Sequence, residues 1–171
     1  MNGNWLRVTA ADLARAKDDL DWAHEMAQTA VDDEGDRWHC TGKTWHGLDF
    51  LLERYGFAVP IVWGAEAFVE SHYDDDDDDD DESLDTADWG YGPPRYLTPE
   101  QVTAAAASLA DLTEEDLLRG VDPGELTRAE VYPDVWDRAD QLTWAVHHLL
   151  DAKQFFASAA TSGDAVICWL D

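Results

Sequence analysis

Basic residues are scarce in this chain of 171 residues: eleven lysines and arginines stand against 38 aspartates and glutamates, for a formal net charge of −27 at pH 7. Proteins that bind nucleic acids or anionic membranes neutralise phosphate groups with a basic surface. A chain of this composition has too few basic side chains for such a surface, so we expect neither nucleic acid nor membrane among its partners.

Cysteines and long apolar runs are also scarce. Two cysteines, Cys40 and Cys168, are too few to form a recognisable disulfide framework. No apolar run approaches the roughly 18 residues needed to span a bilayer, and the first residues lack the apolar centre of a secretory signal. These absences predict a cytoplasmic protein whose two thiols stay reduced.

The common motifs of enzymes and metal centres are absent as well. The sequence contains no glycine-rich phosphate loop, dinucleotide fingerprint or nucleophile motif. His39, Cys40 and His46 lie within eight residues, but a zinc site needs four ligands at recognisable spacings. His147 and His148 are adjacent, so they point to different faces of a helix. We therefore predict no catalytic residue, no cofactor and no metal centre.

An acidic segment of low complexity extends from about 73 to 88 and contains eight consecutive aspartates, Asp74 to Asp81. Like charges at this density repel one another and bury no apolar surface, so we expect the segment to be extended and mobile. It fails the EF-hand pattern because loop position six is Asp79 where glycine is required. Weak, diffuse binding of divalent cations is an alternative that the sequence leaves open.

The chain nevertheless has enough apolar residues, 45% of the total, to form a core. The patterns predict strands at 5–8 and 165–170 and helices at about 10–31, 45–55, 99–110, 114–118 and 138–160, with Trp45, Leu48, Leu52 and Tyr55 on the buried face of the second helix. Thr98 to Gln101 are predicted to form a capping box at the start of the third helix, and Gly56 to end the second. A loop is predicted to begin at Asp122, and 57–62 is read as either an edge strand or a loop. These elements indicate one α+β domain over residues 1–171, predominantly helical, with a small sheet that includes the C-terminal strand.

Two groups of residues are candidates for a binding site. His46 and Asp49 lie three residues apart on the polar face of a predicted helix, where a carboxylate could orient the imidazole; an ordinary surface pair is the alternative. Arg95 lies in a rigid aromatic turn, either tying that turn to a carboxylate or carbonyls of the core, or anchoring an anionic ligand. A pocket would combine Trp45, His46, Asp49, Arg95, Tyr96 and Trp136, unless the aromatic residues are simply core.

The sequence resembles a known family in three blocks. These are Trp-His-Gly-Leu-Asp-Phe-Leu-Leu from Trp45, Gly-Tyr-Gly-Pro-Pro-Arg-Tyr-Leu-Thr-Pro-Glu-Gln-Val from Gly90, and Tyr132-Pro133 followed by Trp136. They are similar to the DUF1877 family, the bacterial YfbM-like group. Family members often carry histidine where Asp49 stands. The resemblance implies a compact α+β domain, and the family supplies no reaction to carry over.

Two functions are compatible with these observations. The first is a cytosolic, non-enzymatic interaction protein whose acidic face binds a basic protein partner, as in toxin–immunity pairs. The alternative is a small-ligand-binding protein or enzyme with an aromatic pocket around Trp45, His46, Arg95, Tyr96 and Trp136. A concave pocket joining these residues would favour the alternative. The sequence does not determine the oligomeric state.

Overall fold

The computed structural model describes residues 1–69 and 88–171. The run from Asp74 to Asp81 lies outside the described residues. The prediction that the acidic segment is mobile and the alternative that it binds cations weakly therefore concern residues that the structure does not describe. Among the residues that are described, no helix is both long enough and apolar enough to cross a membrane.

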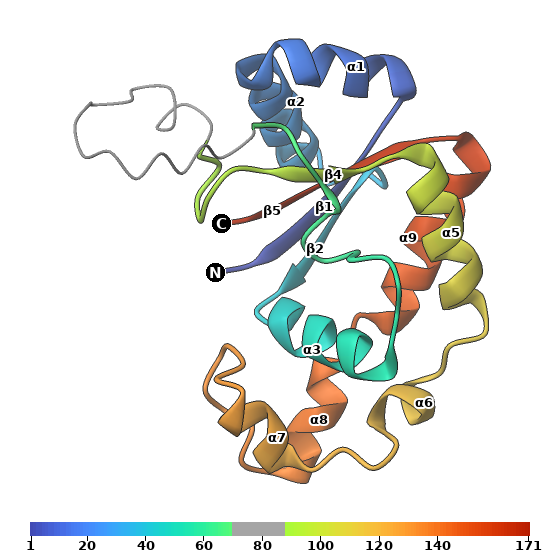
Figure 1. Ribbon diagram of the computed structural model, residues 1–171. Helices are drawn as coiled ribbons and strands as arrows, with labels where there is room; N and C mark the ends of the chain where they lie inside the picture. The colour runs from blue at the N-terminus through green and yellow to red at the C-terminus, as the bar shows by residue number, and fades with distance from the viewer. Residues whose placement is uncertain (70–87) are drawn as a thin grey trace, which may run out of the picture.

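The centre of the fold is a five-stranded antiparallel sheet with the strand order β2-β1-β5-β4-β3. The strands are β1 (Gly3–Val8), β2 (Trp38–Gly42), β3 (Glu66–Ala67), β4 (Arg95–Leu97) and β5 (Ala165–Leu170). The backbone amides of Asn2 and Asp171 each donate to the other's carbonyl, so the two ends of the chain lie together (Figure 1). The predicted small sheet with a C-terminal strand is confirmed.

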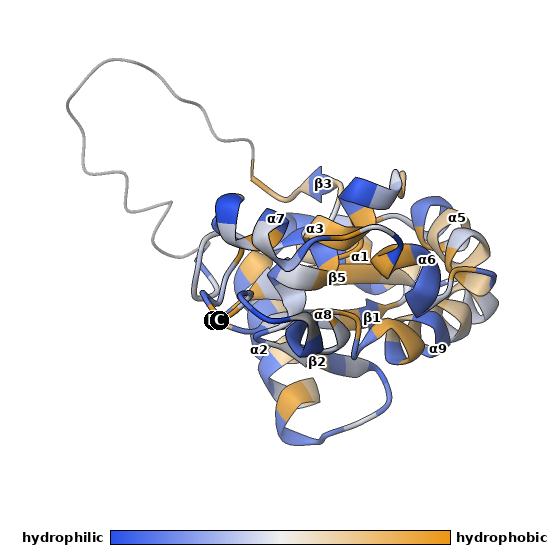
Figure 2. Ribbon diagram, turned by 90° about the horizontal axis from the view of Figure 1, so that it is seen from below, coloured by the Kyte–Doolittle hydropathy of each residue, from blue (hydrophilic) through white to orange (hydrophobic). Residues whose placement is uncertain are grey.

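Helices cover both faces of this sheet (Figure 1). The helices of the described residues are α1 (Ala10–Asp18), α2 (Leu20–Asp32), α3 (Trp45–Tyr55), α5 (Pro99–Ala110), α6 (Glu114–Leu118), α7 (Pro123–Arg128), α8 (Ala139–Ala145) and α9 (Leu149–Ser162), of which α6, α7 and α8 lie beyond α3, away from the sheet (Figure 1). Residues Ile167 and Trp169 of β5 pack with α1 and α2, whereas Val166, Cys168 and Leu170 pack in the larger core with α3, α5 and α9. Both faces of β5 are therefore buried, which explains its continuous apolar sequence along the middle of the molecule (Figure 2).

Two predicted long helices are each two shorter helices. The first breaks at Asp19, whose side chain accepts a hydrogen bond from the backbone amide of Trp22 and so caps α2. The helix predicted at 138–160 stops at Ala145 and restarts at Leu149. The apolar periodicity does not record either break, because both halves of each pair still turn an apolar face to the core.

The predicted ends of two helices are confirmed, whereas several other local predictions are wrong. The capping box of Thr98 and Gln101 forms, and Gly56 ends α3 in the left-handed conformation (φ +88°). Tyr55 is 52% exposed, so the prediction that it is buried is wrong; its position in the last turn of α3 leaves the ring in water. Strands β2, β3 and β4 were not predicted, helix α7 forms where a loop was predicted from Asp122, and 57–62 forms no strand.

Candidate functional site

Two glycines leave room for close packing of helix α3, Gly3 on the side of the sheet and Gly47 on the side of Trp136. A Cβ atom at Gly3 of β1 would lie 2.6 Å from the Cβ atom of Trp45, and one at Gly47 would lie 2.8 Å from the ring of Trp136. Larger residues at either position would push the helix away. This packing buries Trp45 and Asp49 and brings the polar face of α3 to the loops that precede β3 and α8.

Two hydrogen bonds join the polar face of α3 to these loops. The indole Nε1 of Trp63 donates to Oδ2 of Asp49 at 2.7 Å. The backbone amide of Tyr132 donates to Nδ1 of His46 at 2.9 Å. Because Nδ1 of His46 accepts, the neutral imidazole carries its proton on Nε2. We call the five residues Trp45, His46, Asp49, Trp63 and Tyr132 the α3 aromatic site.

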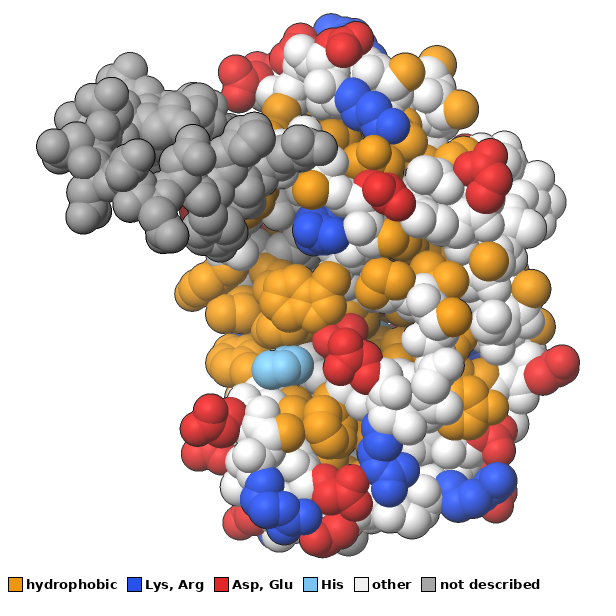
Figure 3. Space-filling view, in the orientation of Figure 1, with side chains coloured by type: hydrophobic (Ala, Val, Ile, Leu, Met, Phe, Trp, Pro, Cys, Tyr) orange, Lys and Arg blue, Asp and Glu red, His pale blue; other side chains and the backbone are white. Residues whose placement is uncertain are grey.

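The rings of this site stack on one another. The Trp45 and His46 rings are nearly parallel, with centroids 4.7 Å apart, and the Trp63 ring meets Trp45 edge-on at 5.1 Å. Trp45 is only 3% exposed, whereas Trp63 is 39% exposed. Figure 3 shows hydrophobic side chains gathered on the face above α3, with a histidine and an acidic side chain at their edge. The site thus has a buried floor and an exposed indole that a partner can reach.

A cavity of about 260 Å³ opens beside Asp49. Its wall combines the two carboxylates Asp49 and Glu53 with the hydrocarbon of Leu52, Phe57, Val59 and Ile61. An apolar wall with a few convergent polar groups is the usual composition of a small binding pocket. The segment from Phe57 to Ile61, which the sequence patterns left undecided between strand and loop, therefore forms a wall of the candidate site.

Burial raises the pKa of Asp49 to about 6, against the opposing effect of the Trp63 hydrogen bond and with a smaller contribution from the charge of Glu53. Burial also lowers the pKa of His46, although the nearby Glu53 opposes this change. Asp49 therefore changes from a hydrogen-bond donor to an anionic acceptor close to neutral pH, next to a neutral imidazole. Carboxyl groups with such a pKa in a cleft are candidates for functional groups.

The other three residues of the predicted pocket lie elsewhere. Arg95 and Tyr96 are consecutive residues of β4, so their side chains leave opposite faces of the sheet. Tyr96 packs against Phe68 in the core beneath α1 and α2. Trp136 is 1% exposed and donates from Nε1 to the carbonyl of Val131 at 2.8 Å. The structure therefore brings Trp45, His46 and Asp49 together on α3 but places Arg95, Tyr96 and Trp136 elsewhere. Of the six residues, only Asp49 lines the cavity.

Arg95 acts on the site from a distance. Its Nε donates to the carbonyl of Gly64 at 2.9 Å and its Nη2 to that of Ala65 at 2.7 Å. These carbonyls directly follow Trp63, so Arg95 fixes the loop that presents this indole to Asp49. Of the two roles considered for Arg95, the contacts are those of a structural tie to backbone carbonyls.

We expect Arg95→Met to destabilise the protein by about 2–3 kcal/mol, because two partly buried carbonyls lose a charged donor. Arg95→Lys keeps the charge but not the planar fork, and we expect it to recover only part of that loss. Urea unfolding measures both. Arg138→Met is the matched control, because the exposed Arg138–Asp140 pair should contribute less than about 1 kcal/mol. Equal stability of all three variants would contradict the structural role of Arg95.

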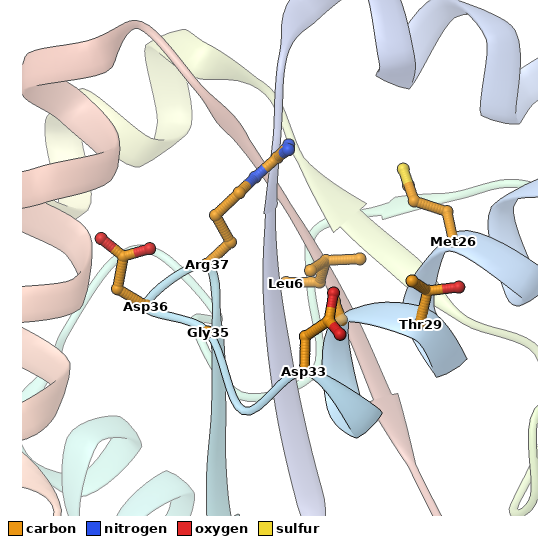
Figure 4. Close-up of a pocket in the computed structure, with 8 residues that line it drawn as sticks. Leu6, Met26, Thr29, Asp33, Gly35, Asp36 and Arg37 are labelled. Atoms are coloured by element: carbon orange, nitrogen blue, oxygen red, sulfur yellow. The ribbon is translucent and has the colours of Figure 1, made fainter.

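A second hollow, of about 320 Å³, lies between α2, β1 and the loop that leads into β2. Figure 4 shows Leu6 at its floor, with Met26 and Thr29 of α2 on one side and Asp36 and Arg37 on the other. The Nε of Arg37 already donates to the carbonyl of Arg7. Its lining in the described part of the chain includes no histidine or cysteine, so we place the candidate site at α3.

Comparisons with known proteins agree with this fold and name no activity. The family model described as "Domain of unknown function (DUF1877)" matches residues 1–169. A solved structure, that of a protein of unknown function, YfbM from Escherichia coli, aligns with 98% of this chain and 98% of its own at a TM-score of 0.64. The sequence identity is 17%, so the likeness concerns the fold alone. No curated protein sequence matches the chain significantly.

Proposed function

This chain belongs to the DUF1877 family, whose function is unknown, and we propose that it is a binding protein for a basic protein partner. In this proposal the acidic surface attracts the partner, and the cavity beside Asp49 receives one of its lysine or arginine side chains. The observation that carries the proposal is a cavity lined by two carboxylates and an apolar wall, with the exposed indole of Trp63 hydrogen-bonded to one of those carboxylates, Asp49.

The distribution of charge supports this choice of partner. Eleven of the 38 acidic residues fall in 70–87, so the described residues carry 27 acidic against 11 basic side chains. Ten of those eleven basic side chains already contact a carboxylate, a carbonyl or an aromatic ring of the chain itself. The surplus of carboxylates therefore favours cations and speeds their association at low salt.

The chemistry of the cavity matches a lysine or arginine side chain. The ionised Asp49 and Glu53 offer oxygen acceptors to an ammonium or guanidinium group. The exposed face of Trp63 can hold the same cation by a cation–π interaction. The apolar wall from Phe57 to Ile61 suits the hydrocarbon stem that carries the charge.

A small organic cation is the second candidate ligand. A cavity of about 260 Å³ beside a carboxyl group with a pKa of about 6 favours it, because small-molecule sites commonly combine these two features. An amine with a short alkyl chain would make the same contacts as a lysine side chain without the rest of a protein partner.

The experiment follows the Trp63 indole N–H signal by NMR while a lysine-rich peptide or butylammonium is added at low salt and pH 7.5. We expect the peptide to shift this signal, and Asp49→Asn to weaken binding at least about tenfold, since the charged acceptor is lost. Glu114→Gln, on the exposed start of α6, is the control that removes one charge away from the cavity.

Each outcome decides between the readings. Equal affinity of the wild type and Asp49→Asn for the peptide would contradict binding of its basic side chain in the cavity beside Asp49. Butylammonium binding as tightly as the peptide would favour the small-ligand function. The absence of a shift with either probe would contradict both.

A further inference from the structure

We propose that His39, His148 and Asp151 bind a divalent transition-metal ion, with an open coordination position facing a neighbouring cavity. One ligand atom from each of these three side chains lies within 4.8 Å of the other two. Ligand atoms around one zinc or iron ion lie about 3–4 Å apart, so small side-chain rotations complete the site. This centre is separate from the α3 aromatic site and does not depend on its function.

Two elements, β2 and the start of α9, place the ligands. His39 belongs to β2, whereas His148 is the residue before α9 and Asp151 lies in the first turn of that helix. The spacing of three residues puts His148 and Asp151 on one side of the helix start. Nδ1 of His148 and Oδ2 of Asp151 lie 3.2 Å apart as a hydrogen-bonded pair, a contact that a bound ion would replace. The ring of His39 meets that of His148 edge-on, with centroids 5.2 Å apart.

The unpaired nitrogen of His39 is the strongest sign of a ligand. Its Nε2 is buried and has no hydrogen-bond partner among the described residues. Buried polar atoms are nearly always paired, so an unpaired one in a well-packed region calls for an explanation. Stacking on Trp5 at 5.5 Å and contact with Phe155 hold the ring in place. A metal ion would supply the missing partner.

The types of the three side chains suit a transition metal. An imidazole nitrogen offers a lone pair for coordination. Two imidazoles and one carboxylate suit ions such as Zn²⁺ and Fe²⁺, whereas Ca²⁺ and Mg²⁺ take oxygen ligands.

The cavity beside these ligands indicates what kind of centre this is. It has a volume of about 270 Å³, and His39 and Asp151 both line it. The other lining residues are the charged Arg7 and Asp36, and Trp38, Gln154, Phe155 and Ser158. Structural zinc sites are closed by four protein ligands, whereas sites with three protein ligands keep a position for water or a substrate oxygen. Three ligands next to a cavity therefore point to a centre that takes a small molecule with an oxygen donor.

No pattern in the sequence indicated this site. The metal centre considered from spacing used His39, Cys40 and His46 and was rejected, and no metal was predicted. His148 is far from His39 in the sequence, and only the packing of the start of α9 beside β2 brings the two together. Cys40, the next residue of β2, is not among the three ligands; its sulfur accepts from the backbone amide of Gly42.

The test is titration of the full chain with Co²⁺, followed by visible absorption, and then displacement by Zn²⁺. We expect one tight site, which His148→Gln and Asp151→Asn each weaken at least about tenfold. His147→Gln is the matched control, because His147 is exposed and adjacent but outside the ligand set. Its affinity for Co²⁺ should equal that of the wild type.

The aspartate-rich segment supplies a second control, because it can attract cations unspecifically. A chain without Asp74–Asp81 should retain the tight Co²⁺ site. Thermal unfolding with and without Zn²⁺ gives an independent readout, since an ion that binds only the folded state raises the midpoint. The proposal is wrong if His148→Gln binds Co²⁺ as tightly as the wild type, or if deletion of the aspartates alone abolishes binding.

Discussion

Trp45→Ala is expected to destabilise the protein by about 3–5 kcal/mol, the usual range for truncating a buried tryptophan. The side chain is 3% exposed and belongs to the larger core, where it contacts the rings of His46, Trp63 and Tyr132. Its removal leaves a void between α3 and β1 that the sheet cannot close without moving the helix. Chemical denaturation monitored by circular dichroism measures this loss.

The matched control for this substitution is Tyr55→Ala in the same helix. Tyr55 is 52% exposed, so we expect a change below about 1 kcal/mol. Trp45→Phe adds a second comparison. The buried Nε1 of Trp45 has no hydrogen-bond partner among the described residues, so burying this N–H costs free energy. Phenylalanine avoids that cost, which should offset part of the stability lost with the smaller ring. A cost for Trp45→Ala near that of Tyr55→Ala would show that Trp45 is not part of the core.

Asp49→Asn is expected to stabilise the protein above pH 7 by as much as about 3 kcal/mol and to have little effect near pH 4. The folded-state pKa of Asp49 is raised from its ordinary value of 3.8 to about 6, so the folded protein keeps this proton over a range in which the unfolded chain releases it. Stability therefore falls as the pH rises from about 4 to 6, by about 1.4 kcal/mol for each pH unit at most. An asparagine at position 49 removes this pH-dependent loss of stability, and its side-chain oxygen can still accept the hydrogen bond from the Trp63 indole.

Urea denaturation of the wild type and the variant at half-unit steps from pH 4 to pH 8 measures the difference. The other carboxyl groups titrate in both proteins, so their effects cancel in the comparison. Glu53→Gln is the control, because Glu53 is exposed on the same helix and should change stability by less than about 0.5 kcal/mol. A constant difference between wild type and Asp49→Asn at every pH would contradict the raised pKa.

Local sequence signals predicted the ends of elements better than their continuity. The capping box at Thr98 and the glycine after Tyr55 act within one turn of the chain, so the residues present decide them. The break at Asp19 was missed because aspartate is tolerated inside a helix as well as at its cap. The turn between α8 and α9 was missed for a related reason, since the apolar stripe resumes in register on the next helix.

Part of the candidate site was predictable because it depends only on local helical geometry. Trp45, His46 and Asp49 lie within five residues of one helix, so helical geometry alone brings them together. Their partner Trp63 depends on a loop that Arg95 holds in place, and the cavity wall depends on the path of 57–61. Arg95 and Tyr96 were assigned to the same pocket although neighbours on a strand point to opposite sides.

By itself, the sequence determined the α+β class, the charge, the C-terminal buried strand and the family resemblance, because these follow from composition, periodicity and short motifs. Only the tertiary structure decided which distant residues meet: Trp63 with Asp49, Arg95 with the carbonyls of Gly64 and Ala65, and His39 with His148. It also decided the ionisation of Asp49, because the pKa of a carboxyl group depends on how far folding removes it from water, and no local pattern records that burial.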